Sequence, residues 1–109
     1  MQDLFVEELR NLKIDADPET GRIFVDGVEY KPTILRTARG YTYPRIVVYD
    51  PRWWKSKRYG NRPFLANRII WAFAYGFCSG ASIIKAKNGD VFDVRISNLI
   101  EMPRRGTRE

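Results

Sequence analysis

The sequence of 109 residues contains no histidine and a single cysteine, Cys78. Without histidine, nucleophilic catalysis of the Ser-His-Asp and Cys-His types is excluded, and one cysteine does not complete a structural zinc site. A lone cysteine also forms no internal disulfide, which fits a reducing compartment. We therefore expect no metal or other cofactor, and we expect Cys78 to be a small buried apolar residue.

Long apolar runs are also absent. The longest spans nine residues, 69–77, whereas a helix needs about 20 to cross a bilayer. The N-terminal Met1-Gln2-Asp3 lacks the basic start of a secretory signal. We expect a cytoplasmic protein without a membrane partner, in which the apolar run is a buried helix.

Positive charge is abundant and unevenly distributed. The chain has 19 basic and 13 acidic residues, a net charge of +6 and a pI near 9.7. Residues 1–30 carry three basic and eight acidic side chains, whereas residues 31–109 carry sixteen and five. This asymmetry suggests a polyanionic partner such as nucleic acid. A basic surface that serves only solubility is an equally good interpretation of composition alone.

Turn residues and apolar spacing predict hairpins in the first half of the chain. Asp3 is placed to cap a helix over 4–12. Asp26-Gly27 is a strong hairpin signal between strands over 22–25 and 28–31.

A second hairpin is predicted from 33–37 and 41–50. Pro44 has no N–H for a sheet ladder, so this strand is expected at an edge or with a late start. Tyr43, Arg45, Val47 and Tyr49 share one face of it.

The second half is predicted to contain the main core element. Its pattern indicates a helix over 65–75 ended by Gly76, a strand over 82–86, a tight turn at 87–90 and a short helix from Asp93 to Pro103. The polar tail 104–109 is expected to be disordered.

A basic aromatic loop, residues 51–63, is one candidate binding segment. With two adjacent tryptophans, one is expected to pack inward and the other to face outward. An exposed tryptophan among cations suits stacking on bases, but packing of both against the core is an equal alternative. The candidates are Arg52, Trp53, Trp54, Lys55, Lys57, Arg58 and Arg62, with Arg45 as a weaker one.

Three segments have a familiar order and spacing. Residues 12–24 contain Asp-Pro-Glu-Thr-Gly followed by Arg-Ile-Phe, residues 67–76 read NRIIWAFAYG, and residues 88–99 read NGDVFDVRISNL. They resemble, respectively, the DPETG segment, the HRLVWAFHYG helix and the DHINGD-x-x-DNRISNL motif of phage and intron-type HNH homing endonucleases. Three matches in register are much more specific than one.

The departures from this family fall on its chemistry. The family's metal-binding Asp and general-base His correspond to Lys85 and Ala86, and the His that opens its helix corresponds to Asn67. Alanine has no proton acceptor, and loss of a positioned base typically costs about 10²–10⁴-fold in rate. Lys85 repels a divalent cation and attracts phosphate. Asn98, a metal ligand in the family, is retained, but we expect it to make a structural hydrogen bond.

The resemblance also implies a fold and an architecture. It implies an α+β fold with N-terminal β-hairpins, a central core helix and a C-terminal ββα-metal (HNH-like) unit. We expect a single domain over 1–103, made of a hairpin region (1–50), the basic aromatic loop (51–63) and the HNH-like unit (64–103). Asp90 and Asp93 are substitute metal ligands in principle, but a turn residue and a helix cap are the favoured interpretation.

The function predicted from these features is DNA binding without catalysis. The protein is expected to be a phage-encoded, inactive HNH-like protein of the host cytoplasm that modulates transcription or DNA metabolism. It would bind duplex DNA through phosphate contacts from Lys85, Lys87 and Arg95. Two alternatives remain, an effector that inhibits a host protein such as RNA polymerase or a nuclease, and a residual metal-dependent nuclease.

Overall fold

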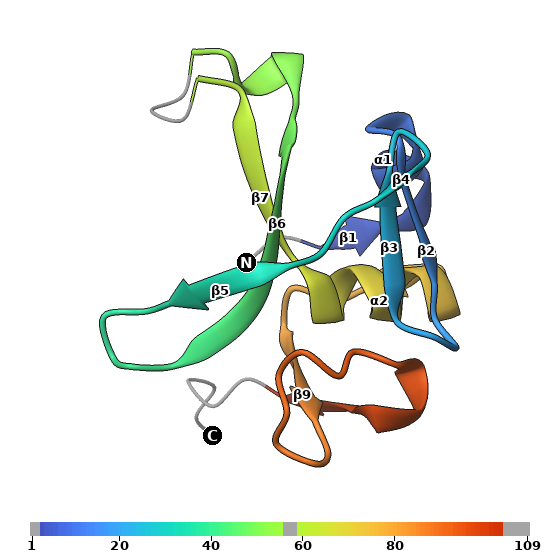
Figure 1. The fold of residues 1–109 in the computed structure, drawn as a ribbon, viewed down its shortest axis with the longest axis vertical. Helices are drawn as coiled ribbons and strands as arrows, with labels where there is room; N and C mark the ends of the chain where they lie inside the picture. The colour runs from blue at the N-terminus through green and yellow to red at the C-terminus, as the bar shows by residue number, and fades with distance from the viewer. Residues whose placement is uncertain (1–2, 56–58, 104–109) are drawn as a thin grey trace.

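The computed structural model describes residues 3–55 and 59–103 and has an α+β fold (Figure 1). Within those ranges, four small antiparallel sheets lie around the helix α2 (Ala66–Tyr75). The α+β class predicted from the sequence is confirmed. None of the helices in the described ranges is long and apolar enough to span a membrane.

The chain begins with a short strand and a short helix. The strand β1 (Leu4–Phe5) precedes α1 (Val6–Asn11) and pairs with β8 (Phe77–Cys78). The predicted cap is wrong, because α1 has no side-chain cap and the Asp3 carboxylate accepts a hydrogen bond from the Gly80 backbone N–H at 2.7 Å. The pairing with β8 extends Leu4 and Phe5, so the helix is shorter than the sequence predicts.

The first predicted hairpin is confirmed. The sheet contains β2 (Ile14–Asp17), β3 (Arg22–Val25) and β4 (Val28–Glu29) in that order. Asp26 and Gly27 connect β3 to β4 with φ values of 54° and 82°. Both values lie in the left-handed region, which is the conformation that a tight two-residue hairpin turn requires.

The second hairpin is also confirmed, but its long strand is not an edge strand. The sheet order is β5 (Thr33–Arg36), β6 (Thr42–Tyr49) and β7 (Asn61–Leu65). The pairing of β6 with β7 begins at Arg45, so Pro44 is paired only with Ile34 of β5. The missing N–H of Pro44 is thus tolerated because the central strand has one neighbour at that point.

The helix α2 is the core element that the sequence predicts. Ile69, Ile70 and Ala72 are fully buried, and the helix contacts α1, β2, β6 and β9. Gly76 ends it with φ of 84° and donates its N–H to the Ala72 carbonyl. Cys78 is a free, buried thiol whose pKa is raised by burial, as expected of a small apolar core residue.

The C-terminal segment forms a β-hairpin. The strands β9 (Ser82–Ala86) and β10 (Leu99–Pro103) pair antiparallel, and η2 (Ile96–Asn98) is a single 3₁₀ turn. The predicted helix from Asp93 to Pro103 is therefore wrong. Leu99 is buried and the four residues after it are exposed, and the whole segment pairs residue by residue with β9. Of the expected ββα unit, the described residues contain the two strands.

Candidate nucleic-acid interface

The Asp-Pro-Glu-Thr-Gly turn packs against the loop between β9 and β10. The Pro18 carbonyl accepts a hydrogen bond of 2.8 Å from the Ile96 backbone N–H. Gly21 has φ of 77°, and a Cβ at this position would lie 3.0 Å from the Arg95 backbone nitrogen. Two of the segments that suggested the HNH resemblance are thus in direct contact, and the turn fixes the backbone that carries Arg95.

The hairpin brings the predicted degenerate positions together. Ala86 pairs with Leu99 and Lys85 with Ile100, while the Lys87 backbone N–H donates to the Asn98 carbonyl at 2.7 Å. Ala86 is half-buried, whereas Lys85 and Lys87 are exposed. The surface beside Ala86 and Asn98 therefore carries two accessible ammonium groups.

The buried Asn98 side chain holds the loop closed. Its Nδ2 donates to Asn88 Oδ1 at 3.0 Å and to the Asp93 carbonyl at 2.8 Å, and its Oδ1 accepts from the Asn88 backbone N–H at 3.3 Å. The predicted structural role of Asn98 is confirmed by these hydrogen bonds. Both the nitrogen and the oxygen of the Asn98 side-chain amide are therefore hydrogen-bonded to other residues of the loop.

Asp93 forms a bidentate ion pair with Arg95. Arg95 donates from Nε and Nη2 to the two carboxylate oxygens at 2.8 Å each, and Asn88 Nδ2 donates to Asp93 Oδ2 at 3.1 Å. The Arg95 hydrogen bonds hold the pKa of Asp93 at about 2. The predicted helix cap is wrong, because the 3₁₀ turn has no side-chain cap. Asp90 does act in the turn, through a bond from the Phe92 N–H.

The divalent ion that an HNH nuclease uses does not fit this set of residues. Lys85 places an ammonium where the family has a carboxylate, the Asp93 charge is balanced by Arg95, and the Asn98 amide is engaged in the loop. In the described part of the chain, no three His, Cys, Asp or Glu side chains are grouped to hold a metal ion. We derive no hydrolytic step from this site.

The base of the basic aromatic loop is an ion-pair network. Asp50, fully buried, accepts hydrogen bonds from Arg52 at 2.9 and 3.1 Å and from Arg62 Nη1 at 3.1 Å. Arg62 Nη1 also donates to Glu8 at 3.2 Å, and its guanidinium lies over the Phe64 ring. Arg62, predicted as a binding residue, is thus a buried residue that connects β7 to α1. Asp50 was not predicted to be part of a network, because in the sequence it marks only the end of a strand.

The two tryptophans of the loop point to different environments, as predicted. Trp53 is half-buried beneath Arg62, and Trp54 is 58% exposed, with its ring edge against Tyr59. Lys55 is exposed beside them. Lys57 and Arg58 lie outside the described residues.

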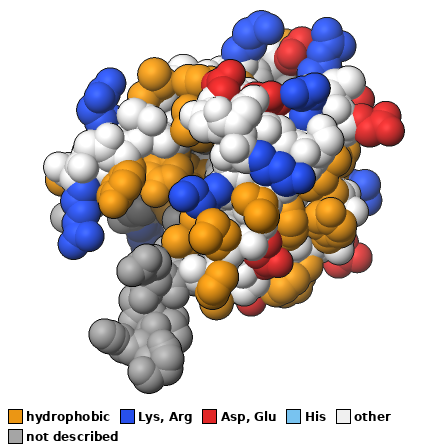
Figure 2. Space-filling view, turned by 90° about the horizontal axis from the view of Figure 1, so that it is seen from below, with side chains coloured by type: hydrophobic (Ala, Val, Ile, Leu, Met, Phe, Trp, Pro, Cys, Tyr) orange, Lys and Arg blue, Asp and Glu red, His pale blue; other side chains and the backbone are white. Residues whose placement is uncertain are grey.

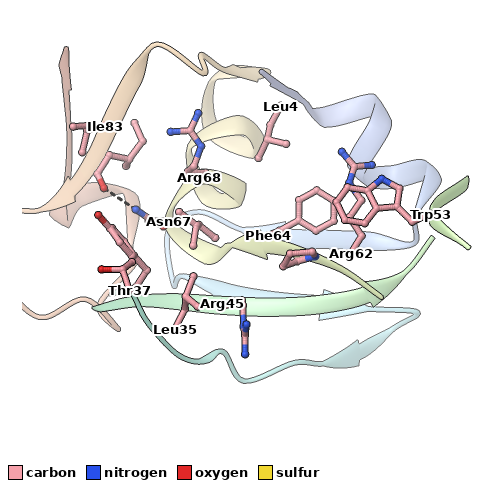
Figure 3. Close-up of a pocket in the computed structure, with 14 residues that line it drawn as sticks. Leu4, Leu35, Thr37, Arg45, Trp53, Arg62, Phe64, Asn67, Arg68 and Ile83 are labelled. Atoms are coloured by element: carbon pink, nitrogen blue, oxygen red, sulfur yellow. Dashed lines mark hydrogen bonds between the residues drawn. The ribbon is translucent and has the colours of Figure 1, made fainter. Parts of the chain in front are cut away.

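Arg45 lines a cavity of about 590 Å³ with residues of β5, β7, α2 and β9 (Figure 3). The helix residue Asn67 also lines it and donates from Nδ2 to the Ile84 carbonyl at 2.6 Å. Asn67 stands at the position of a family histidine in the HNH resemblance, but no cavity was predicted there. The only sequence feature that pointed to this position was a polar residue, Asn67, at the start of an otherwise apolar helix.

The charged side chains are dispersed over the face seen in Figure 2, which is viewed from the side of β9 and β10. Lys and Arg side chains alternate there with hydrophobic and acidic ones. The cations therefore do not form one continuous patch on this face.

The sheets, the central helix and the docked turn define an α+β fold of the HNH endonuclease kind. The structure is similar to a solved structure of the HNH homing endonuclease I-HmuI, with a TM-score of 0.57 and 15% sequence identity. That enzyme binds and cleaves DNA. The match covers 94% of this chain and 53% of the other, so the chain spans about half the length of I-HmuI. No family model and no curated protein matches the sequence. The likeness confirms the HNH-like α+β fold that the resemblance implied, although the C-terminal helix expected with it is absent from the described residues.

Replacing Gly21 by alanine is expected to destabilise the fold by more than the same change at Gly27. Both glycines have positive φ, but only at Gly21 does a Cβ meet backbone atoms, those of Val94 and Arg95. The shared conformational strain is about 1 kcal/mol, and the contact adds to it. Urea unfolding of Gly21→Ala and Gly27→Ala measures the difference, and equal losses would contradict the docking of the turn.

Replacing Arg95 by glutamine is expected to raise the pKa of Asp93 from about 2 toward 3.8. The bidentate hydrogen bonds of Arg95 are the largest cause of the lowered pKa. Glutamine has no positive charge and lacks the paired N–H donors of a guanidinium group. A carboxyl-carbon NMR titration of both proteins measures this. Arg22→Gln, at an exposed residue on β3, is the control and should leave the Asp93 titration unchanged.

Proposed function

We propose that this protein binds duplex DNA through its phosphates and does not cleave it. The observation that carries the proposal is the residue set at the nuclease position, where Ala86 offers no base and Lys85 offers a cation. Asp93 and Asn98, the neighbouring oxygen donors, are engaged with Arg95 and with the loop. Such a site attracts a phosphate without activating water against it.

The contacts to DNA are assigned first to the exposed ammonium groups. Lys85 and Lys87 have no ion pair in the described part of the chain, whereas Arg95 is balanced by Asp93. Trp54 and Lys55 of the loop are also exposed, and they supply a second contact. We further propose that the protein is phage-encoded, acts in the bacterial cytoplasm and modulates transcription or DNA metabolism through this binding. We also propose that residues 1–103 form a single domain.

Salt-dependent binding tests this function. Fluorescence anisotropy with a labelled duplex is expected to show affinity that falls steeply between about 50 and 200 mM salt, with little sequence preference. Binding through phosphates releases counterions, which sets this slope. Absence of binding at the lower salt concentration would overturn the proposal.

A nicking assay tests the catalytic part separately. Supercoiled plasmid incubated with the protein and Mg²⁺ or Mn²⁺ is expected to remain intact, as in a chelator control. Cleavage that disappears in Asn98→Ala or Asp93→Ala would show that an active metal site exists, and the interpretation of Lys85 and Ala86 would then be wrong.

An exposed aromatic surface favours a second candidate function, binding of a host protein. Phe5 and Phe77 are 51% and 39% exposed with ring centroids 5.0 Å apart, and Tyr75 is 63% exposed. Exposed aromatic clusters are common at protein interfaces. A pull-down from nuclease-treated host lysate distinguishes the two functions. A partner that persists after digestion and is lost in Phe77→Ser favours this candidate.

A further inference from the structure

The cavity beside α2 has the size and lining of a small-molecule site. Its volume of about 590 Å³ lies within the range of about 300–1,000 Å³ that such sites occupy. Strand β7 contributes Pro63, Phe64 and Leu65 to the lining, and β9 contributes Ile83 and Ile84. Phe64 and Ile83 lie on different sides of the cavity in Figure 3. Most of the lining is therefore apolar.

The strand that borders the cavity is poorly suited to bind a peptide as an added strand. In the order β5-β6-β7, β7 is an edge strand, but Pro63 at its centre has no backbone N–H. A proline in this position interrupts the ladder that an incoming strand needs. This favours a compact ligand over an extended chain.

Two buried polar atoms in the lining lack partners among the described residues. Asn67 is only 7% exposed, and while its Nδ2 donates to the Ile84 carbonyl, its Oδ1 accepts no hydrogen bond. The Arg45 Nε likewise donates none. Buried polar atoms are usually paired, so the lining is complementary to a ligand that offers both a donor and an acceptor.

The charge of the lining favours an anion. The residues lining the cavity include Arg45, Arg62 and Arg68 but no Asp or Glu. The charge of Arg62 is balanced by Asp50 and Glu8 outside the cavity, whereas Arg45 has no ion pair in the described ranges. A carboxylate that reaches Arg45 would meet a cation in partly apolar surroundings, where the attraction exceeds that in water.

We propose that this cavity binds a small aromatic carboxylate that also carries a hydrogen-bond donor. The flat apolar body packs between Phe64, Leu65 and Ile83. The donor reaches Asn67 Oδ1, and the carboxylate reaches Arg45. This site is separate from the proposed DNA contacts of Lys85 and Lys87, and its test involves no DNA.

A set of matched probes tests the proposal with the unmodified protein. Indole-3-acetate has all three features, tryptophol lacks the charge, tryptamine reverses it, and naphthalene-1-acetate lacks the N–H. ¹H–¹⁵N NMR titrations are expected to shift the amides of Leu65, Ile83 and Ile84 and the Asn67 side chain. Indole-3-acetate is expected to bind about tenfold more tightly than tryptophol and several-fold more tightly than naphthalene-1-acetate.

A variant pair identifies the cation. Arg45→Met is expected to weaken indole-3-acetate by about tenfold and to leave tryptophol unchanged, because methionine keeps the apolar stem and loses the charge. Arg36→Met, on the exposed part of β5, is the control and should change neither probe. Equal binding of tryptamine and indole-3-acetate, shifts confined to Phe5 and Phe77, or no shifts at millimolar probe would each overturn the proposal.

Discussion

Replacing Asp50 by alanine is expected to lower the free energy of unfolding by about 3–5 kcal/mol, because it leaves a buried guanidinium without its counter-charge. Asp50 is fully buried and Arg62 is 7% exposed, and the two are joined at 3.1 Å. Glu8, at 3.2 Å from Arg62, compensates only in part because it lies nearer the surface. Urea or thermal unfolding measures the loss.

The exposed Glu19 provides a matched control for Asp50. Glu19→Ala, in the turn before β3, also removes one carboxylate but is expected to change stability by at most about 0.5 kcal/mol. An Asp50 variant as stable as this control would contradict the importance of the buried network.

The pH dependence of stability gives an independent measure of Asp50. Hydrogen bonds from Arg52, followed by those from Arg62, hold its pKa at about 2, below the ordinary 3.8. A lowered pKa in the folded state means that Asp50 stabilises the protein fully above about pH 4 and loses this contribution as the pH falls toward 2. The Asp50→Ala variant is therefore expected to lose less stability than the wild type over this interval.

Reversing the charge of Lys85 and Lys87 together is expected to weaken DNA binding by about 10- to 100-fold near 0.1 M salt. Each phosphate contact adds about one to the slope of log affinity against log salt, so the slope should fall by about two. Lys85→Glu/Lys87→Glu is suited to this test, because both side chains are exposed and no ion pair joins them to described residues.

Lys13 and Lys31 provide the control for this pair. They are exposed on the N-terminal elements, so Lys13→Glu/Lys31→Glu changes the net charge equally at another place. If both double variants lose the same affinity, binding depends on total charge and the assignment to the β9 hairpin is wrong. If neither does, the loop with Trp54 and Lys55 becomes the main contact.

Local sequence patterns correctly predicted the turns, helices and strands whose conformation is set by residues close to them in the chain. Asp26-Gly27 predicted a tight turn because few residue pairs adopt two successive positive φ values. The apolar segment over 65–75 predicted α2 because a helix apolar nearly all round has to be buried. The strand over 82–86 was predicted with its observed bounds.

Local signals failed where a distant segment competes for the same residues. Leu4 and Phe5 fit a helix, but pairing with Phe77 and Cys78 extends them into β1. Ile96, Leu99 and Ile100 also fit a helix, yet pairing with β9 places Leu99 and Ile100 in a strand and leaves Ile96 in a short 3₁₀ turn. In each case, backbone hydrogen bonds to another segment outweigh a weak local preference.

The sequence by itself determined which chemistry the nuclease position lacks, because Ala86 has no proton acceptor in any conformation and histidine is absent. Only the tertiary structure decided which cations face solvent. Arg62 and Lys85 are both basic in the sequence, but Arg62 is buried against Asp50 and Lys85 is exposed on β9. The physical reason is that the surroundings of a side chain depend on residues far along the chain, whereas its functional group does not.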